Sequence, residues 1–153
     1  MASNLKVIIT NPQTVIKIPS GTRMLVRRSC HAALEYEHYD NRIDIHVVFA
    51  DNEMLHEHDD KRVSSFEAPE VIALSPEEER SLGTLIISVE RVTELTKVYN
   101  RSFEMGIVYS SVHGVLNLLG QYYTDQDSKD TQMHKEAKIL TQLGYSPIVG
   151  YDS

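Results

Sequence analysis

A long helix with a wide apolar face is the feature of this sequence that most limits how the chain can fold. After Ser102, apolar residues recur at i, i+3, i+7, i+10, i+11 and i+14, which places them on one side of a helix. They are Met105, Val108, Val112, Val115, Leu116 and Leu119. Gly120 then predicts the end of the helix. A face this wide must be buried, so the rest of the chain has to build a core around it.

Several short segments rich in β-branched residues predict the strands of that core. The predicted strands are Leu5–Ile9, with Val15–Ile18 as an extension beyond Asn11-Pro12, then Ile43–Phe49, a short strand at Val63–Phe66, and Leu82–Ile87. In the second of these, Ile43, Ile45 and Val47 alternate with polar residues, which indicates a strand with one buried face.

Capping residues predict where the other helices begin. The expected starts are Ser20, Asp51, Ser75-Pro76-Glu77-Glu78, Ser88, and Thr124 with Asp127. The helix from Ser20 runs to about His38 and points Val26, Cys30, Ala33 and Leu34 inward. The helix after Ser88 points Val92, Leu95, Val98 and Tyr99 inward, and the last helix Met133, Ala137, Leu140 and Leu143. The order of elements predicts an α+β fold in a single domain spanning residues 1–153, with a central mixed sheet of about four strands packed by about five helices.

Composition narrows the classes of function. The 153 residues carry 15 Lys+Arg and 22 Asp+Glu, a formal charge of −7, so no overall positive field attracts nucleic acid. The one local concentration of positive charge is Arg23, Arg27 and Arg28 on the first helix, which we interpret either as a face for RNA phosphates or as an ordinary solvated face. The single Cys30, the lack of a signal-like N-terminus and the lack of a long apolar run predict a soluble cytoplasmic protein.

His113 and Asn117 are the main candidates for chemistry. They lie four residues apart, so both side chains project from one face of the long helix, and the chain can fold back after Gly120 to bring Tyr123 near them. Taken alone, a His-x-x-x-Asn pattern fits a hydrogen-bonded packing histidine better than a metal ligand.

The wider pattern resembles the bacterial YbeY family over nearly the whole chain. The order of segments matches that family: LGTLIIS is followed by a helix, then by SFEMGIVYSSVHGVLNLLG, and then by a capped last helix. Its motif His-Gly-x-Leu-His-Leu-x-Gly-Tyr-Asp-His corresponds here to HGVLNLLGQYY, from His113 to Tyr123. The resemblance implies a YbeY-like fold and a zinc-dependent single-strand endoribonuclease of rRNA maturation.

The same resemblance implies that most of the metal site has been replaced. His113 stands at the first ligand position, whereas the second and third histidines of the family are Asn117 and Tyr123 here. A carboxamide oxygen is a weak neutral donor, and a tyrosine must lose a proton with an ordinary pKa near 10 before it binds strongly. We therefore expect zinc to be weakly bound or absent.

Further departures concern the cleft. The family's acidic residue after Leu-Gly is Thr84 here, and the basic loop is shortened to DDKRVSSFEAP. Ser65 and Phe66 match the family's cleft wall, and Arg62 is the candidate for its loop arginine.

Other polar groups have plainer explanations. Asp125, Asp127, Asp130 and His134 can form a substitute metal site with His113, although carboxylates at a helix start are already explained by the helix dipole. His31, Glu35 and His38 share one helix face, and His56 and His58 lie in a charged loop; solvated surface explains both sets. Ser110 and Ser111 lie near His113 but lack an acidic third member for nucleophilic catalysis.

These observations predict an rRNA-maturation or ribosome-assembly factor with weakened or lost hydrolysis, with rRNA and ribosomal particles as partners. The alternatives are a non-catalytic adaptor on the same fold, which binds RNA, a ribosomal protein or an assembly GTPase, and an interaction module of unrelated function. The catalytic residues stay unassigned.

Overall fold

The computed structural model describes residues 4–61, 69–121 and 125–145. The strands are β1 (Leu5–Thr10), β2 (Ile43–Ala50), β3 (Val71–Leu74) and β4 (Ser81–Ser88). The α-helices are α1 (Thr22–Tyr36), α2 (Asn52–Glu57), α3 (Val89–Val98), α4 (Phe103–Leu118) and α5 (Gln126–Gln142), with a 3-10 helix at Asp59–Lys61. Within these ranges the four strands and five α-helices agree with the predicted α+β fold.

The sheet is mixed, with the strand order β1-β2-β4-β3. β1, β2 and β4 are parallel, and β3 pairs antiparallel to β4 at one edge. Helix α1 connects the parallel neighbours β1 and β2, as a crossover between parallel strands requires.

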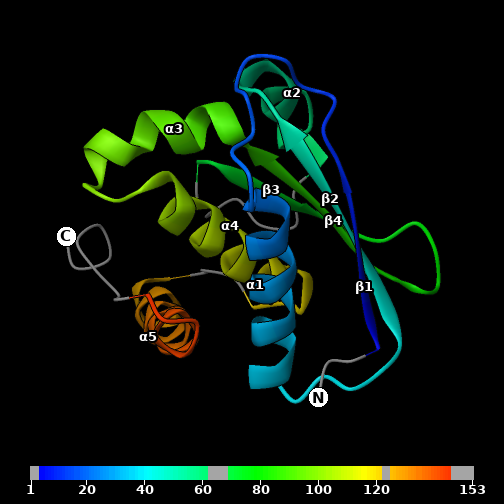
Figure 1. Cartoon of the computed structure of the whole chain (residues 1–153). Helices are drawn as coiled ribbons and strands as arrows, with labels where there is room; N and C mark the ends of the chain where they lie inside the picture. The colour runs from blue at the N-terminus through cyan, green and yellow to red at the C-terminus, as the bar shows by residue number, and fades with distance from the viewer. Residues whose placement is uncertain (1–3, 62–68, 122–124, 146–153) are drawn as a thin grey trace.

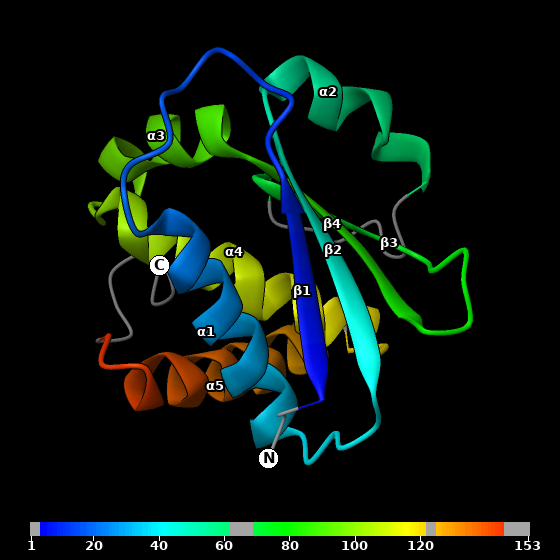
Figure 2. The same ribbon diagram turned by 45° about the vertical axis from the view of Figure 1, so that its right-hand side comes forward.

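Helices cover the two faces of this sheet unequally. Figure 2 shows α1, α4 and α5 on one side and the short α2 on the other. α4 lies in the middle of the large helical layer, where it contacts α1, α3, α5, β3 and β4 (Figure 1). None of the described helices is long and apolar enough to cross a membrane.

Helix α4 is the centre of the core, as its apolar face predicted. Met105, Val108, Val112, Val115 and Leu116 are all buried, whereas Leu119 is partly exposed. The helix approaches β4 closely at Gly114, where a Cβ atom would come within 2.7 Å of the Leu85 side chain. Gly120 follows α4 with φ of 86°, a left-handed conformation that favours glycine.

Truncating Leu116 tests this assignment of the core. Leu116 has no exposed surface, so Leu116→Ala is expected to reduce the free energy of unfolding by roughly 2–5 kcal/mol. Leu119→Ala is the matched control, because this partly exposed residue loses fewer contacts. Denaturant unfolding of both variants measures the difference. A loss below about 1 kcal/mol for Leu116→Ala would contradict the packing described here.

Two predictions about the first part of the chain are wrong. Val15–Ile18 does not extend a strand, because Gln13 turns the chain: its side chain accepts from the Ile16 backbone N–H at 2.9 Å and donates to the Ile16 carbonyl at 2.7 Å. The N-cap of α1 is Gly21, with φ of 89°, rather than Ser20. The inward residues of α1 are as predicted.

The region between β2 and β4 also differs from the prediction. Ser75-Pro76-Glu77-Glu78 forms no helix but lies in the exposed connection between the antiparallel strands β3 and β4, where the chain must reverse. β3 itself was missed, because a four-residue strand at a sheet edge carries little periodicity. The strand predicted at Val63–Phe66 lies outside the described residues. Asp51 caps α2 as expected, since its side chain accepts from the Met54 N–H at 2.9 Å.

The start of α5 differs from the prediction by one residue. Asp125 and Ser128 form the capping box, rather than Thr124 and Asp127, and Thr124 lies outside the described residues. The buried face is also rotated, since Gln132, Glu136, Ile139 and Leu140 are buried, whereas Met133, Ala137 and Leu143 are only partly so. In α3, Val92 and Leu95 are buried as predicted, but Val98 is 69% exposed because the helix ends there at the surface.

Candidate functional site

His113 lies at the contact between α4 and α5, and no part of its side chain is exposed. Its Nδ1 is 2.6 Å from Oε2 of Glu136, which is equally buried. Gln132, one turn earlier in α5, donates from Nε2 to the same oxygen at 3.0 Å. An ionised carboxylate can only accept, so with Glu136 ionised the proton lies on Nδ1 of His113.

Two side chains of α4 extend this site along the helix. Asn117 lies one turn after His113 and is 2% exposed, so the predicted pairing of the two on one face is confirmed. Tyr109 lies one turn before His113, and the two rings stack with centroids 5.3 Å apart and an angle of 30° between their planes. The face of α4 that carries the candidate residues therefore reads Tyr109, His113, Asn117.

The donors described here do not fit a zinc site of three strong protein ligands. His113 supplies one imidazole, and Asn117 supplies only a carboxamide. Within residues 4–61, 69–121 and 125–145, no three His, Cys, Asp or Glu side chains are grouped so as to hold a metal ion. Tyr123, the third position, lies outside the described residues, as do Arg62, Ser65 and Phe66.

The carboxylates proposed as a substitute metal site do not gather around His113. Asp125, Asp127, Asp130 and His134 are exposed, whereas His113 is fully buried. Asp125 caps α5, and hydrogen bonds from the backbone and side chain of Ser128 lower the pKa of its carboxyl group. Capping therefore explains this carboxylate without a metal.

The remaining histidine and serine candidates also have structural explanations. Glu35, His38 and His56 are exposed and His31 partly so, and His58 Nδ1 is 3.0 Å from the Met54 carbonyl. Ser110 and Ser111 donate to backbone carbonyls one turn earlier in α4. Burial raises the pKa of the Cys30 thiol to about 12, so this cysteine is unreactive at neutral pH.

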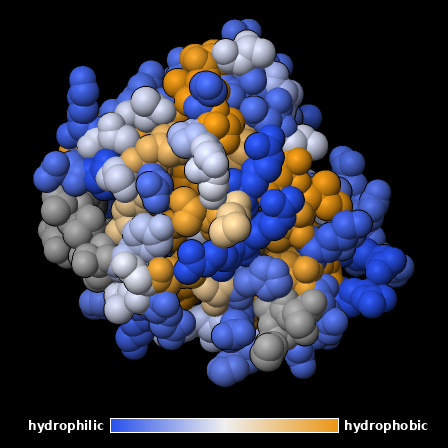
Figure 3. Space-filling view, viewed as in Figure 1, coloured by the Kyte–Doolittle hydropathy of each residue, from blue (hydrophilic) through white to orange (hydrophobic). Residues whose placement is uncertain are grey.

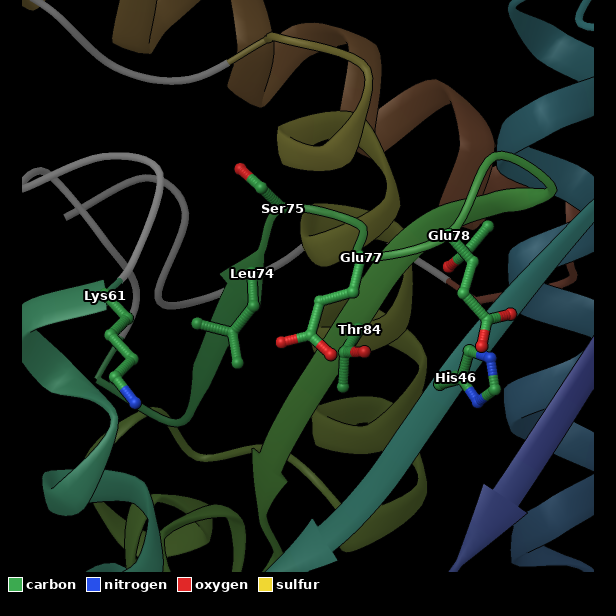
Figure 4. Close-up of a pocket in the computed structure, with 8 residues that line it drawn as sticks. His46, Lys61, Leu74, Ser75, Glu77, Glu78 and Thr84 are labelled. Carbon is green, nitrogen blue, oxygen red and sulfur yellow. The ribbon is translucent and has the colours of Figure 1, made fainter.

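Thr84 lies on the opposite face of the sheet from His113. Its neighbour Leu85 faces α4 beneath Gly114, and successive side chains of a strand point to opposite faces. Thr84 lies in one cross-strand row with His46 and Leu74, above which a cavity of about 440 Å³ opens (Figure 4). Lys61, Glu77 and Glu78 also line this cavity.

The basic residues predicted to meet RNA lie together on α1. Arg23, Arg27 and Arg28 are all exposed, and the Arg23 guanidinium carbon is 5.9 Å from the centre of the Phe49 ring. Strongly hydrophilic side chains lie over α1 on the helical face of the molecule (Figure 3). At the C-terminal end of α1, Lys135 of α5 forms polar contacts: its Nζ donates to Gln121 Oε1 at 2.6 Å and pairs with Glu37 at 3.1 Å.

Comparison with known proteins assigns the family. The sequence model described as "Endoribonuclease YbeY" matches residues 8–144. The chain belongs to the YbeY family. A protein named endoribonuclease YbeY from Caldanaerobacter subterraneus subsp. tengcongensis is 30% identical over 156 residues, covering 92% of this chain and 98% of that protein. One of the same name from Clostridioides difficile is 32% identical over 120 residues, covering 72% and 78%.

The fold agrees with this assignment. The solution structure of TM1509 from Thermotoga maritima superposes with a TM-score of 0.55 at 15% identity, covering 90% of this chain and 91% of that one. The order β1-β2-β4-β3 with α4 across its centre is therefore the YbeY-like fold that the motifs predicted.

Glu136 and Gln132 are site residues that the sequence analysis missed. A signal for them existed, because Leu140 was predicted to point inward, and residues four and eight positions earlier on a helix share its face. Those positions are Glu136 and Gln132. Arg101 and Glu70, a buried ion pair next to Tyr109, have no comparable signal, since their contact joins separate segments of the sequence.

Proposed function

We propose that this YbeY-family chain acts with ribosomal RNA, as a maturation or ribosome-assembly factor of the cytoplasm, and that its zinc-dependent hydrolysis is weakened or lost. The observation that carries the proposal is Asn117, buried one turn after His113 at the position of a family ligand. A carboxamide there leaves His113 as the only imidazole that α4 contributes to the site, and three strong ligands are needed to hold catalytic zinc.

The contact between His113 and Glu136 supports the same proposal. In metal sites a carboxylate commonly orients a ligand histidine through the nitrogen that does not bind the metal. Glu136 is in that relation to His113, at 2.6 Å from Nδ1. The chain thus keeps the support of the first ligand while the second ligand has been exchanged, which favours descent from a working metal site.

A non-catalytic adaptor on the same fold is the second candidate, and the same buried Asn117 favours it. Such a protein would bind RNA, a ribosomal protein or an assembly GTPase without cleaving RNA. The two candidates share their RNA partner and differ in zinc content and hydrolysis.

Zinc content and RNA cleavage distinguish these candidates. We expect elemental analysis of the purified chain to find well under one zinc per chain, and cleavage of single-stranded RNA to be far slower than by a family member with three histidines, because one buried imidazole cannot hold the metal tightly. Stoichiometric zinc with cleavage at the relative's rate would contradict the proposal. Measurable slow cleavage that a chelator abolishes supports weakened hydrolysis, and RNA binding without cleavage supports the adaptor.

The RNA contact is tested on α1. The double variant Arg23→Gln with Arg27→Gln removes two exposed charges one turn apart, and should weaken single-stranded RNA binding and reduce the slope of log K against log salt by about 0.7 per lost phosphate contact. Arg42→Gln with Arg80→Gln removes two exposed arginines elsewhere and is the matched control. Equal losses in both variants would show that net charge, rather than the α1 face, determines binding.

A further inference from the structure

Arg101 is a buried cation in the short connection between α3 and α4. Its side chain is 6% exposed, and its Nη2 donates to Oε2 of Glu70, which has no exposed surface. Glu70 directly precedes β3, and its backbone carbonyl accepts from the Ser88 N–H at 2.8 Å. The ion pair therefore ties the chain that enters β3 to the start of α4.

The guanidinium of Arg101 also contacts two aromatic rings. Its central carbon lies 4.8 Å from the centroid of Tyr99 and 5.1 Å from that of Tyr109. A guanidinium is planar and can stack flat on an aromatic ring, whereas a lysine ammonium is a compact point charge and cannot. Because Tyr109 stacks in turn on His113, Arg101 is connected through a single ring to the candidate site.

The ion pair is an inefficient way to stabilise a fold. It is made through one nitrogen and one oxygen, and two further buried atoms, Glu70 Oε1 and Arg101 Nε, have no hydrogen-bond partner among the described residues. Buried charges repay their desolvation only when the geometry is good and the remaining polar atoms are satisfied. Replacing such a pair by apolar residues of similar size is often neutral or stabilising, so the stability of the fold is a weak explanation for these two residues.

We propose that Arg101 is a positioning residue of the site: with Glu70 it holds the Tyr109 ring against His113 and fixes the entry to β3 relative to α4. One guanidinium thus links the start of β3 to the helix that bears His113. The proposal rests on the proposed function only in treating His113 as part of a working site.

The decisive variant removes the charge pair as a unit. In Glu70→Gln with Arg101→Met, no buried charge is left unpaired, so the fold should persist, but the guanidinium no longer lies over the Tyr109 ring. The readout is the NMR signal of the His113 ring protons, assigned by their loss in His113→Gln. In the wild type the stacked Tyr109 ring should shift these signals upfield of the exposed His56, and in the double variant we expect that shift to be lost.

Two further variants keep the test decisive. Arg101→Lys keeps a charge beside Glu70 and lacks the planar group, so it should also lose the shift even if the double variant does not fold. Arg91→Lys is the matched control, because Arg91 pairs with Glu94 on the surface of α3 and is 41% exposed. Unchanged His113 signals in a folded Arg101 variant would overturn the proposal.

RNA binding by the same variants separates this proposal from the proposed function. If the wild type binds RNA and the Arg101 variants bind it more weakly, while Arg91→Lys binds it as well as the wild type, the position of the Tyr109 and His113 rings contributes to RNA binding. A wild type that binds no RNA would refute the proposed function, whereas the His113 signals would still decide whether Arg101 positions the ring.

Discussion

Replacing Asn117 and Tyr123 together by histidine is expected to create a zinc site that neither replacement creates alone. His113 and residue 117 already lie on one face of α4, both buried, so Asn117→His adds a second imidazole one turn from the first. Tyr123→His adds a third at the family's remaining ligand position. Three imidazoles with one open coordination position are a ligand set of catalytic zinc, whereas two bind far more weakly.

The measurement is zinc affinity and stoichiometry for the wild type, both single variants and the double variant at one pH, because imidazole must be neutral to bind. The two changes should couple strongly instead of adding, since the ligands act on one ion. Tight zinc in the wild type, or no gain in the double variant, would show that the family's site geometry has not been kept.

Glu136 supplies an internal control for this experiment. In the double variant, Glu136→Gln should weaken zinc binding by about 10- to 100-fold, the usual effect of losing the carboxylate that orients a ligand histidine. Asp130→Asn, which removes an exposed carboxylate from the same helix, should leave zinc affinity unchanged. Recovery of RNA cleavage is not expected in any of these variants, because the shortened basic loop remains.

Removing Glu136 from the natural chain should destabilise it severely. Its carboxyl group is fully buried, accepts from Gln132 and lies 2.6 Å from Nδ1 of His113, so Glu136→Ala removes a partner that two buried side chains share. A buried donor that loses its acceptor costs about 1–3 kcal/mol. Denaturant unfolding of Glu136→Ala measures this cost, with the exposed Asp130→Ala as the control, expected to lie within about 0.5 kcal/mol of the wild type.

A double-mutant cycle identifies the partner of Glu136. The combined variant of Glu136→Ala and His113→Ala should be less destabilised than the sum of the two single variants, since both single variants lose the same buried contact, which the double variant loses only once. Strict additivity would mean that the 2.6 Å contact contributes nothing specific to stability.

The elements that the sequence predicted well are those whose signal is local. In α4 the apolar residues recur at helical spacing, Ser102 caps the first turn by accepting from the Met105 N–H at 3.0 Å, and Gly120 ends it. β4 has a similarly clear run of apolar and β-branched residues. These features depend on neighbours a few positions apart, so no knowledge of the fold was needed.

The misplaced elements are those in which distant contacts outweighed local preference. Ser75-Pro76-Glu77-Glu78 carries the residues of a helix start, but pairing of β3 with β4 requires a chain reversal there. In α5 Leu140 is buried as predicted, but its face also buries the polar Gln132 and Glu136, which apolar spacing alone does not mark because their burial depends on the contact with α4.

The sequence by itself determined the family and brought His113 and Asn117 to one helix face, because both follow from the order of residues and from helical spacing. Only the tertiary structure decided what surrounds that face. Glu136 is 23 residues from His113 and Glu70 is 31 residues from Arg101, so each contact depends on how the helices and the sheet pack together. Thr84 was separated from His113 for the same reason: the alternation of β4 and the position of α4 place the two residues on opposite faces of the sheet.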